Sequence, residues 1–135
     1  MKKLHFRCDR NFTKEQAAAL FQSIGWFSGE YPAQLARALR QAHRVVTAWE
    51  GDRMVGLCST LSDGCMTVYV NYMLVLPELQ GKGIGKTLLR MTLAPYSRGP
   101  YRRFLLLSDK PAVGFYEKFG FTADDSSLPM MLVRR

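Results

Sequence analysis

A glycine-rich segment, "LQGKGIGKTLL" at residues 79–89, constrains the fold of this chain more than any other stretch. Gly81, Gly83 and Gly85 follow an apolar run that ends at Pro77, and they lead into the apolar spacing of a helix. Glycine lets the main chain turn sharply and approach a ligand closely, and the start of a helix attracts anions. The segment therefore predicts a strand, a phosphate-binding loop and a helix in that order.

Two common phosphate-binding loops do not fit this segment. The end "GIGKT" is similar to a nucleotide-binding P-loop, but that motif requires glycine five residues before Gly85, where this chain has Gln80. The dinucleotide-binding pattern G-x-G-x-x-G requires its third glycine one position later than "GKGIGK" provides. A tight turn without a ligand is a further interpretation, although three glycines cost chain entropy. These mismatches favour a different pyrophosphate ligand.

The chain before the loop predicts one strand, two helices and a three-stranded meander. Alternation in "KLHFRC" predicts the strand, and Thr13 and Gln16 have capping-box spacing at the start of the first helix. Pro32 suits the first turn of the second helix. The short turns "GDR" and "SDG" divide residues 44–76 into three extended segments, as expected of antiparallel hairpins.

The chain after the loop predicts two more helices and three more strands. A helix is expected near residues 83–95, followed by "RRFLLLS" as a buried strand in parallel contact. "DKPAVGFYEKFGF" predicts a short helix with Asp109 as N-cap, and "GFTAD" and "PMMLVRR" predict two closing strands. The expected fold class is α/β, with a mixed, mostly antiparallel sheet of about six or seven strands and helices on both faces. The expected order is strand, two helices, three strands, helix, strand, helix and two strands.

Composition narrows the class of protein. A length of 135 residues predicts one domain over residues 1–135, and no stretch approaches the roughly 18 apolar residues of a membrane span. The N-terminal "MKKLHFRCDRNF" lacks the apolar core of a signal peptide, so a cytoplasmic protein is expected. The three cysteines have no CxxC spacing, so neither a metal site nor a disulfide framework is indicated.

The formal net charge of +8 favours an anionic partner. The basic residues are scattered, and no run of Lys and Arg interleaves with aromatic residues, so nucleic acid is not the expected partner. A polyphosphate cofactor would also be attracted by this charge.

The pattern Q-x-x-G-x-G, formed by Gln80, Gly83 and Gly85, resembles the acetyl-CoA-binding motif of the GNAT superfamily of N-acetyltransferases. The terminal "VGFYEKFGF" is a second matching motif in the right order. The resemblance covers nearly the whole chain and suggests a small single-domain member of the bacterial type. It implies acetyl-CoA as cofactor, a small-molecule or peptide amine as acceptor, and direct transfer through a tetrahedral intermediate. A homodimer is compatible with it.

The resemblance also implies roles for individual residues. The main chain of Leu74, Val75 and Leu76 would pair with the pantetheine arm like an added strand, and an N–H of Leu74 or Val75 would stabilise the oxyanion. Tyr116 matches the tyrosine that acts as general acid to the coenzyme A thiolate. The expected cofactor-binding set is Leu74, Val75, Leu76, Gln80, Gly81, Lys82, Gly83, Ile84, Gly85, Lys86 and Phe115.

The general base and the acceptor site are less defined. Tyr69 occupies the position where the family often has a carboxylate, and Glu30 and Asp63 are the nearest plausible acids. The expected acceptor-site residues are Trp26, Phe27, Glu30 and Tyr31 in "GWFSGEY", with Tyr69 and Asn71 in "TVYVNYM". A coenzyme A-binding sensor without catalysis and a basic nucleic-acid-binding module stay open as alternatives.

Overall fold

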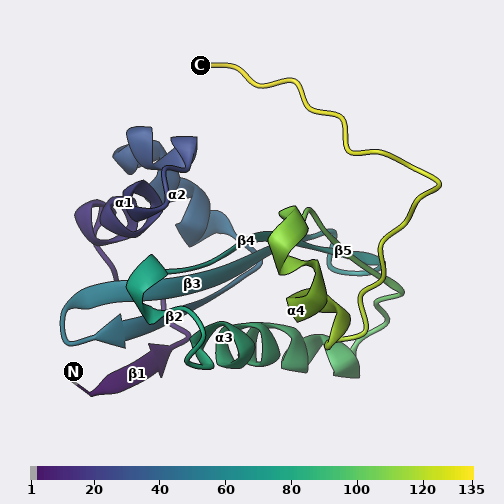
Figure 1. Cartoon of the computed structure of the whole chain (residues 1–135), viewed down its shortest axis with the longest axis horizontal. Helices are drawn as coiled ribbons and strands as arrows, with labels where there is room; N and C mark the ends of the chain where they lie inside the picture. The colour runs from purple at the N-terminus through teal and green to yellow at the C-terminus, as the bar shows by residue number, and fades with distance from the viewer. Residues whose placement is uncertain (1–2) are drawn as a thin grey trace.

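A five-stranded mixed sheet with its strands in sequence order forms the centre of the molecule (Figure 1). The computed structural model describes residues 3–135, so residues 1 and 2 of the expected domain lie outside the described residues. The strands are β1 (Leu4–Arg7), β2 (Arg44–Glu50), β3 (Arg53–Ser62), β4 (Thr67–Val75) and β5 (Arg103–Leu106). Neighbouring strands from β1 to β4 are antiparallel, and β5 runs parallel to β4.

Helices cover both faces of this sheet, as the sequence predicts: α1 and α2 lie on one face, and α3 and α4 on the other (Figure 1). The α-helices are α1 (Lys14–Ser23), α2 (Pro32–Gln41), α3 (Ile84–Leu93) and α4 (Val113–Glu117). The described residues also form 3-10 helices that connect these elements: η1 (Phe27–Glu30), η2 (Pro77–Leu79), η3 (Ala94–Arg98) and η4 (Lys110–Ala112). None of the helices described between residues 3 and 135 is long and apolar enough to cross a bilayer.

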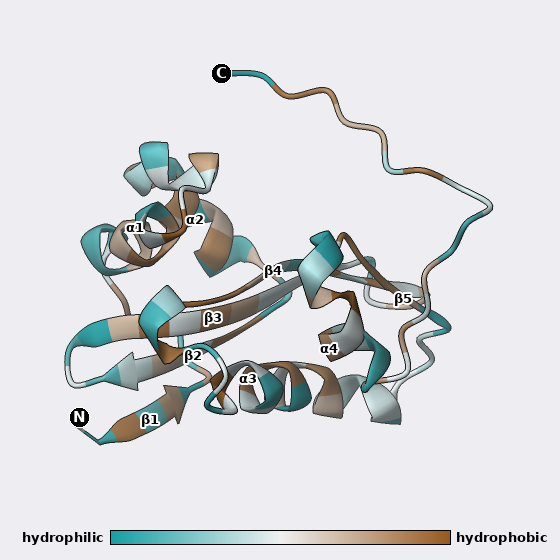
Figure 2. Ribbon diagram, in the orientation of Figure 1, coloured by the Kyte–Doolittle hydropathy of each residue, from teal (hydrophilic) through white to brown (hydrophobic). Residues whose placement is uncertain are grey.

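Local signals set the helix starts. The Gln16 N–H donates to Thr13 Oγ1 at 3.0 Å and the Thr13 N–H donates to Gln16 Oε1 at 2.9 Å, which confirms the capping box. Pro32 is the first residue of α2, also as predicted. Hydrophobic stretches of the helices lie against the strands (Figure 2). Phe21 of α1 and Leu88 of α3 are completely buried in the resulting core.

The two predicted closing strands are wrong, and the sheet has five strands rather than six or seven. Within residues 3–135, no strand pairing joins residues 121–135 to the sheet. The segment instead arches away from β5 toward η1 (Figure 1), where Arg135 pairs with Glu30 at 3.0 Å. An apolar segment such as "PMMLVRR" becomes a strand only where a neighbouring strand pairs with it. Because β5 lies at the edge of the sheet, it is half-buried and not the buried strand that was expected.

An irregularity in β4 opens the sheet near its centre. Tyr72 and Val70 pair with consecutive residues of β3, so Asn71 is an extra residue in β4. Such a bulge bends a strand and increases its twist. The parallel pairing between β4 and β5 ends at Val70 and Leu106. Beyond this point, no strand described between residues 3 and 135 pairs with the edge of β4 that faces β5.

Candidate functional site

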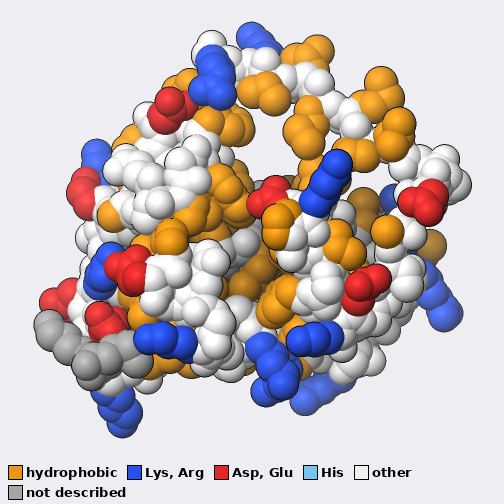
Figure 3. Space-filling model, in the orientation of Figure 1, with side chains coloured by type: hydrophobic (Ala, Val, Ile, Leu, Met, Phe, Trp, Pro, Cys, Tyr) orange, Lys and Arg blue, Asp and Glu red, His pale blue; other side chains and the backbone are white. Residues whose placement is uncertain are grey.

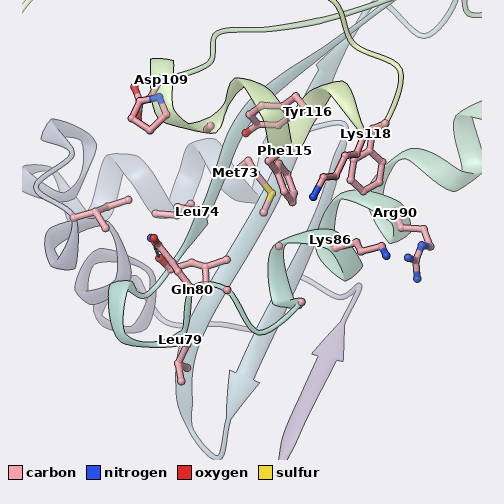
Figure 4. Close-up of a pocket in the computed structure, with 18 of the residues that line it drawn as sticks. Met73, Leu74, Leu79, Gln80, Lys86, Arg90, Asp109, Phe115, Tyr116 and Lys118 are labelled. Carbon is pink, nitrogen blue, oxygen red and sulfur yellow. Dashed lines mark hydrogen bonds between the residues drawn. The ribbon is translucent and has the colours of Figure 1, made fainter.

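A cavity of about 990 Å³ lies where β4 and β5 separate, within the usual size of a ligand pocket. Strand β4, the glycine loop, α3, the β5–α4 connection and the segment after α1 all contribute to its walls (Figure 4). Figure 3 shows a hollow on this face with hydrophobic side chains in its walls. The lining residues are Ile24, Trp26, Met73, Leu74, Val75, Leu79, Gln80, Gly81, Gly83, Gly85, Lys86, Arg90, Asp109, Pro111, Ala112, Phe115, Tyr116, Lys118 and Phe119.

The glycine loop takes a conformation that requires glycine. Gly81 and Gly83 have φ angles of +81° and +85°, which L-residues with a side chain rarely adopt. At Gly85, an added Cβ would lie 3.1 Å from Met73 Cε, so the helix start packs closely against β4. Gly83 is the N-cap of α3 and offers no side chain to cap it, so the first amides of α3 are available to an anion.

Two hydrogen bonds fix this loop. The Gln80 side-chain Nε2–H donates to the Val75 carbonyl at 3.1 Å and ties the loop to the end of β4. The Thr87 hydroxyl donates to the Gly83 carbonyl at 3.1 Å within the first turn of α3. The loop is therefore held against the open edge of β4, ready to bind a ligand that spans both.

Tyr116 lines the cavity although only 8% of its surface is exposed. Its ring packs edge-on against Phe115 and Phe121, with centroid distances of 5.1 Å and 6.1 Å. Burial above all, and then the charges of Cys58 and Asp109, raise the pKa of Tyr116 to about 12. The phenol consequently stays protonated at neutral pH and can donate a proton to a group in the cavity.

The charged side chains of the cavity are segregated. Lys86, Arg90 and Lys118 lie together on one side, and Asp109 lies on the opposite side, with Tyr116 between them (Figure 4). Of the lining residues in the described part of the chain, Asp109 is the one with a carboxylate. The site thus offers positive charge to one end of a ligand and negative charge to the other.

Most of the residues predicted for the cofactor meet in this cavity. Leu74, Val75, Gln80, Gly81, Gly83, Gly85, Lys86, Phe115 and Tyr116 all line it. Leu76 and Ile84 do not: both are 2% exposed and belong to the core. Lys82 lies in the loop between Gly81 and Gly83, but it is exposed and does not line the cavity.

Of the residues predicted for the acceptor, only Trp26 lines the cavity. Phe27 and Tyr31 are exposed and pack edge-on against each other at 6.4 Å. Tyr69 and Asn71 are half-buried on β4, where burial raises the pKa of Tyr69.

The two carboxylates named as candidate bases lie elsewhere. Glu30 pairs with Arg135, outside the cavity. Asp63 accepts hydrogen bonds from the main-chain N–H groups of Cys65, Met66 and Thr67 in the β3–β4 turn, and these bonds lower its pKa.

Sequence reasoning missed several lining residues: Ile24, Met73, Arg90, Asp109 as a cavity residue, and Lys118. One signal was present, because Lys86 and Arg90 are four residues apart and must share a face of α3. The place of Asp109 in the cavity could not be predicted from neighbouring residues, because it depends on the path that the chain takes after β5.

The family model described as an acetyltransferase (GNAT) domain matches residues 8–130. The chain therefore belongs to the GNAT acetyltransferase family, which is a family of acyltransferases.

Named relatives agree with this assignment. A histone acetyltransferase of Glycine max is 27% identical over 124 residues, which cover 84% of this chain and 53% of that protein, so the chain spans about half of its length. The solved structure of a GNAT family protein from Streptococcus pneumoniae is 26% identical, with a TM-score of 0.79, over 98% of this chain and 99% of that one. An aminoglycoside N-acetyltransferase in complex with CoA shares the fold, with a TM-score of 0.71 and 14% identity over 100% of this chain and 96% of that one.

Proposed function

We propose that this protein transfers the acetyl group of acetyl-CoA to an amine by direct attack on the thioester. The observation that carries the proposal is that one cavity joins the glycine loop, the open edge of β4 and the protonated phenol of Tyr116. These three features follow one another in the order of the pyrophosphate, the pantetheine arm and the thioester of an acyl-CoA molecule.

The cofactor would be held along the length of the cavity. The first amides of α3 and the loop glycines would bind the pyrophosphate, with Lys86, Arg90 and Lys118 balancing its charge. The unpaired main-chain edge of β4 would hydrogen-bond the pantetheine arm as an added strand. The CoA bound to the aminoglycoside N-acetyltransferase of the same fold supports this assignment.

Two groups of the chain would act on the reacting atoms. The main-chain N–H of Val75, on the open edge of β4, would donate to the thioester oxygen and stabilise the negative charge that develops as the amine nitrogen attacks, whereas Leu74 directs its main-chain groups to β3. When the carbon–sulfur bond breaks, the Tyr116 phenol would donate its proton to the thiolate. The acceptor would enter from the end lined by Ile24 and Trp26.

The test is an acetyl-CoA consumption screen that measures thiol release and the mass of the acetylated product. The panel contains amino acids, aryl amines, polyamines, aminoglycosides and peptide N-termini. The proposal predicts an acetylated amine in at least one class. Acetyl-CoA binding without any acetylated product would identify a coenzyme A-binding sensor instead, and oligonucleotide affinity that persists at saturating acetyl-CoA would favour a nucleic-acid-binding module.

A further inference from the structure

Asp109 combines a position in the cavity with a carboxylate that has no structural role. It follows β5 and precedes η4, and its main-chain carbonyl accepts bonds from the Ala112 N–H at 2.9 Å and the Ser108 hydroxyl at 2.8 Å. Its side chain does not cap η4, and no hydrogen bond or ion pair within residues 3–135 engages it. The carboxylate is therefore free to bind a ligand.

Three other carboxylates are engaged in contacts outside the cavity. Glu30 pairs with Arg135 at 3.0 Å, and Glu78 pairs with Arg53 at 3.1 Å. Asp63 holds the β3–β4 turn through three main-chain N–H groups. Asp109 is the one carboxylate among the described residues that line the cavity, so it supplies the negative charge next to a bound ligand.

The segregated charges fix which end of the ligand meets Asp109. A pyrophosphate belongs beside Lys86, Arg90 and Lys118, on the far side of Tyr116 from Asp109 (Figure 4). The acetyl end then lies toward Tyr116 and Asp109. An ammonium group approaching the thioester from there would meet a carboxylate without another partner, which favours a charge-assisted hydrogen bond.

We propose that Asp109 binds the ammonium group of the acceptor and takes the proton that this group must lose before attack. The acceptor class is then the cationic primary alkyl amines, in preference to neutral aryl amines. The inference rests on the proposed function and specifies its acceptor end.

The proton transfers balance. The ammonium gives one proton to the Asp109 carboxylate, which passes it to water, and the nitrogen lone pair forms the bond to the thioester carbon. As the carbon–sulfur bond breaks, sulfur takes the phenolic proton of Tyr116, and the nitrogen loses its second proton, which restores the phenol through water. The amide and the free thiol are formed, and one proton is released to solvent.

A role of Asp109 through Tyr116 alone makes a different prediction. The charge of Asp109 contributes to the raised pKa of Tyr116. If that were its whole effect, Asp109→Asn would change the transfer to every acceptor by the same factor. A role at the ammonium changes only the transfer to cationic acceptors, so a pair of acceptors that differ in charge separates the two.

The experiment compares phenethylamine, a cation at neutral pH, with aniline, which is neutral there, in the full-length protein at saturating acetyl-CoA. Asp109→Asn should lower kcat/KM for phenethylamine by about 100-fold, the usual size of a proton-transfer contribution, and change kcat/KM for aniline little. Its rate profile with phenethylamine should shift to higher pH, because the amine must then lose its proton in solution. Asp109→Glu should recover part of the loss.

The matched control is Glu117→Gln on α4, an exposed carboxylate outside the cavity, which should leave both reactions unchanged. Calorimetric titration of phenethylamine into the CoA-saturated protein provides a readout independent of turnover, and its affinity should fall in Asp109→Asn. Equal losses with both amines, or unchanged binding and transfer of phenethylamine, would overturn the inference. Absence of acetyl transfer to any amine would contradict the proposed function instead, and the binding titration would still decide whether Asp109 holds an ammonium.

Discussion

The hydroxyl of Tyr72 on β4 and the hydroxyl of Ser28 in η1 form a hydrogen bond of 2.8 Å. The ring of Tyr72 also packs edge-on against that of Phe21, with a centroid distance of 4.8 Å, and its centroid lies 6.2 Å from that of the Trp26 ring. Strand β4 therefore fixes the segment that brings Trp26 to the cavity, and the acceptor end of the site depends on a contact that lies outside it.

Tyr72→Phe should destabilise the protein by about 1 kcal/mol, because it leaves the part-buried Ser28 hydroxyl without its partner. It should raise KM for the acceptor, because the segment that carries Trp26 loses its hydrogen bond to β4. The Kd of acetyl-CoA should stay unchanged, because the glycine loop makes no contact with this hydrogen bond. Denaturant unfolding and steady-state kinetics check both effects. A double-mutant cycle with Ser28→Ala that showed no coupling would refute the contact.

Tyr116→Phe should lower kcat by about 100-fold and leave the Kd of acetyl-CoA unchanged, because phenylalanine keeps the ring packing and removes the proton donor. Tyr101→Phe is the matched control, since Tyr101 packs on Tyr96 at 4.9 Å and does not line the cavity. Rates measured with acetyl-CoA and the best acceptor of the screen decide the point. Equal kcat in wild type and Tyr116→Phe would remove Tyr116 from the mechanism.

Stability should fall in alkaline solution. Burial raises the pKa of Cys58 to about 12, and the pKa of Tyr116 is also raised to about 12. The unfolded chain releases these protons near their ordinary pKa values of about 8.5 and 10, so stability is complete below that range and is lost as pH rises toward 12. Unfolding midpoints measured between pH 8 and 11 should decline, and Cys58→Ala should weaken the decline. A flat profile in the wild type would contradict the burial of these groups.

The basic side of the cavity should set cofactor affinity. Lys118→Met removes a charge that lines the cavity, and Lys110→Met removes one that does not. Only the first should weaken acetyl-CoA binding, by about tenfold, because a hydrogen bond to a charged group contributes about 1.5 kcal/mol. The effect should shrink at high salt. Equal affinities of the two variants would show that overall charge, not this cluster, attracts the cofactor.

Local signals predicted most of the fold and the cofactor side of the site. The Thr13 capping box, Pro32 and the glycine loop act within a few residues of one another, so the sequence reveals them directly. The closing strands failed because a strand is defined by a partner elsewhere, and the edge of β5 has none within residues 3–135. Asp109 was predicted only as a helix cap, because its place in the cavity depends on how β5 diverges from β4.

Calorimetric titration of matched glycine variants tests whether the cavity beside the glycine loop binds acetyl-CoA. Gly83 and Gly64 have φ angles of +85° and +78°, and an added Cβ would meet no atom within 4 Å at either position. Aspartate should therefore cost each site a similar backbone strain of about 1 to 2 kcal/mol, but only Gly83 lines the cavity. We expect wild type and Gly64→Asp to bind acetyl-CoA with equal Kd and Gly83→Asp to show no binding. Wild-type affinity in Gly83→Asp would show that the cofactor does not bind at this loop.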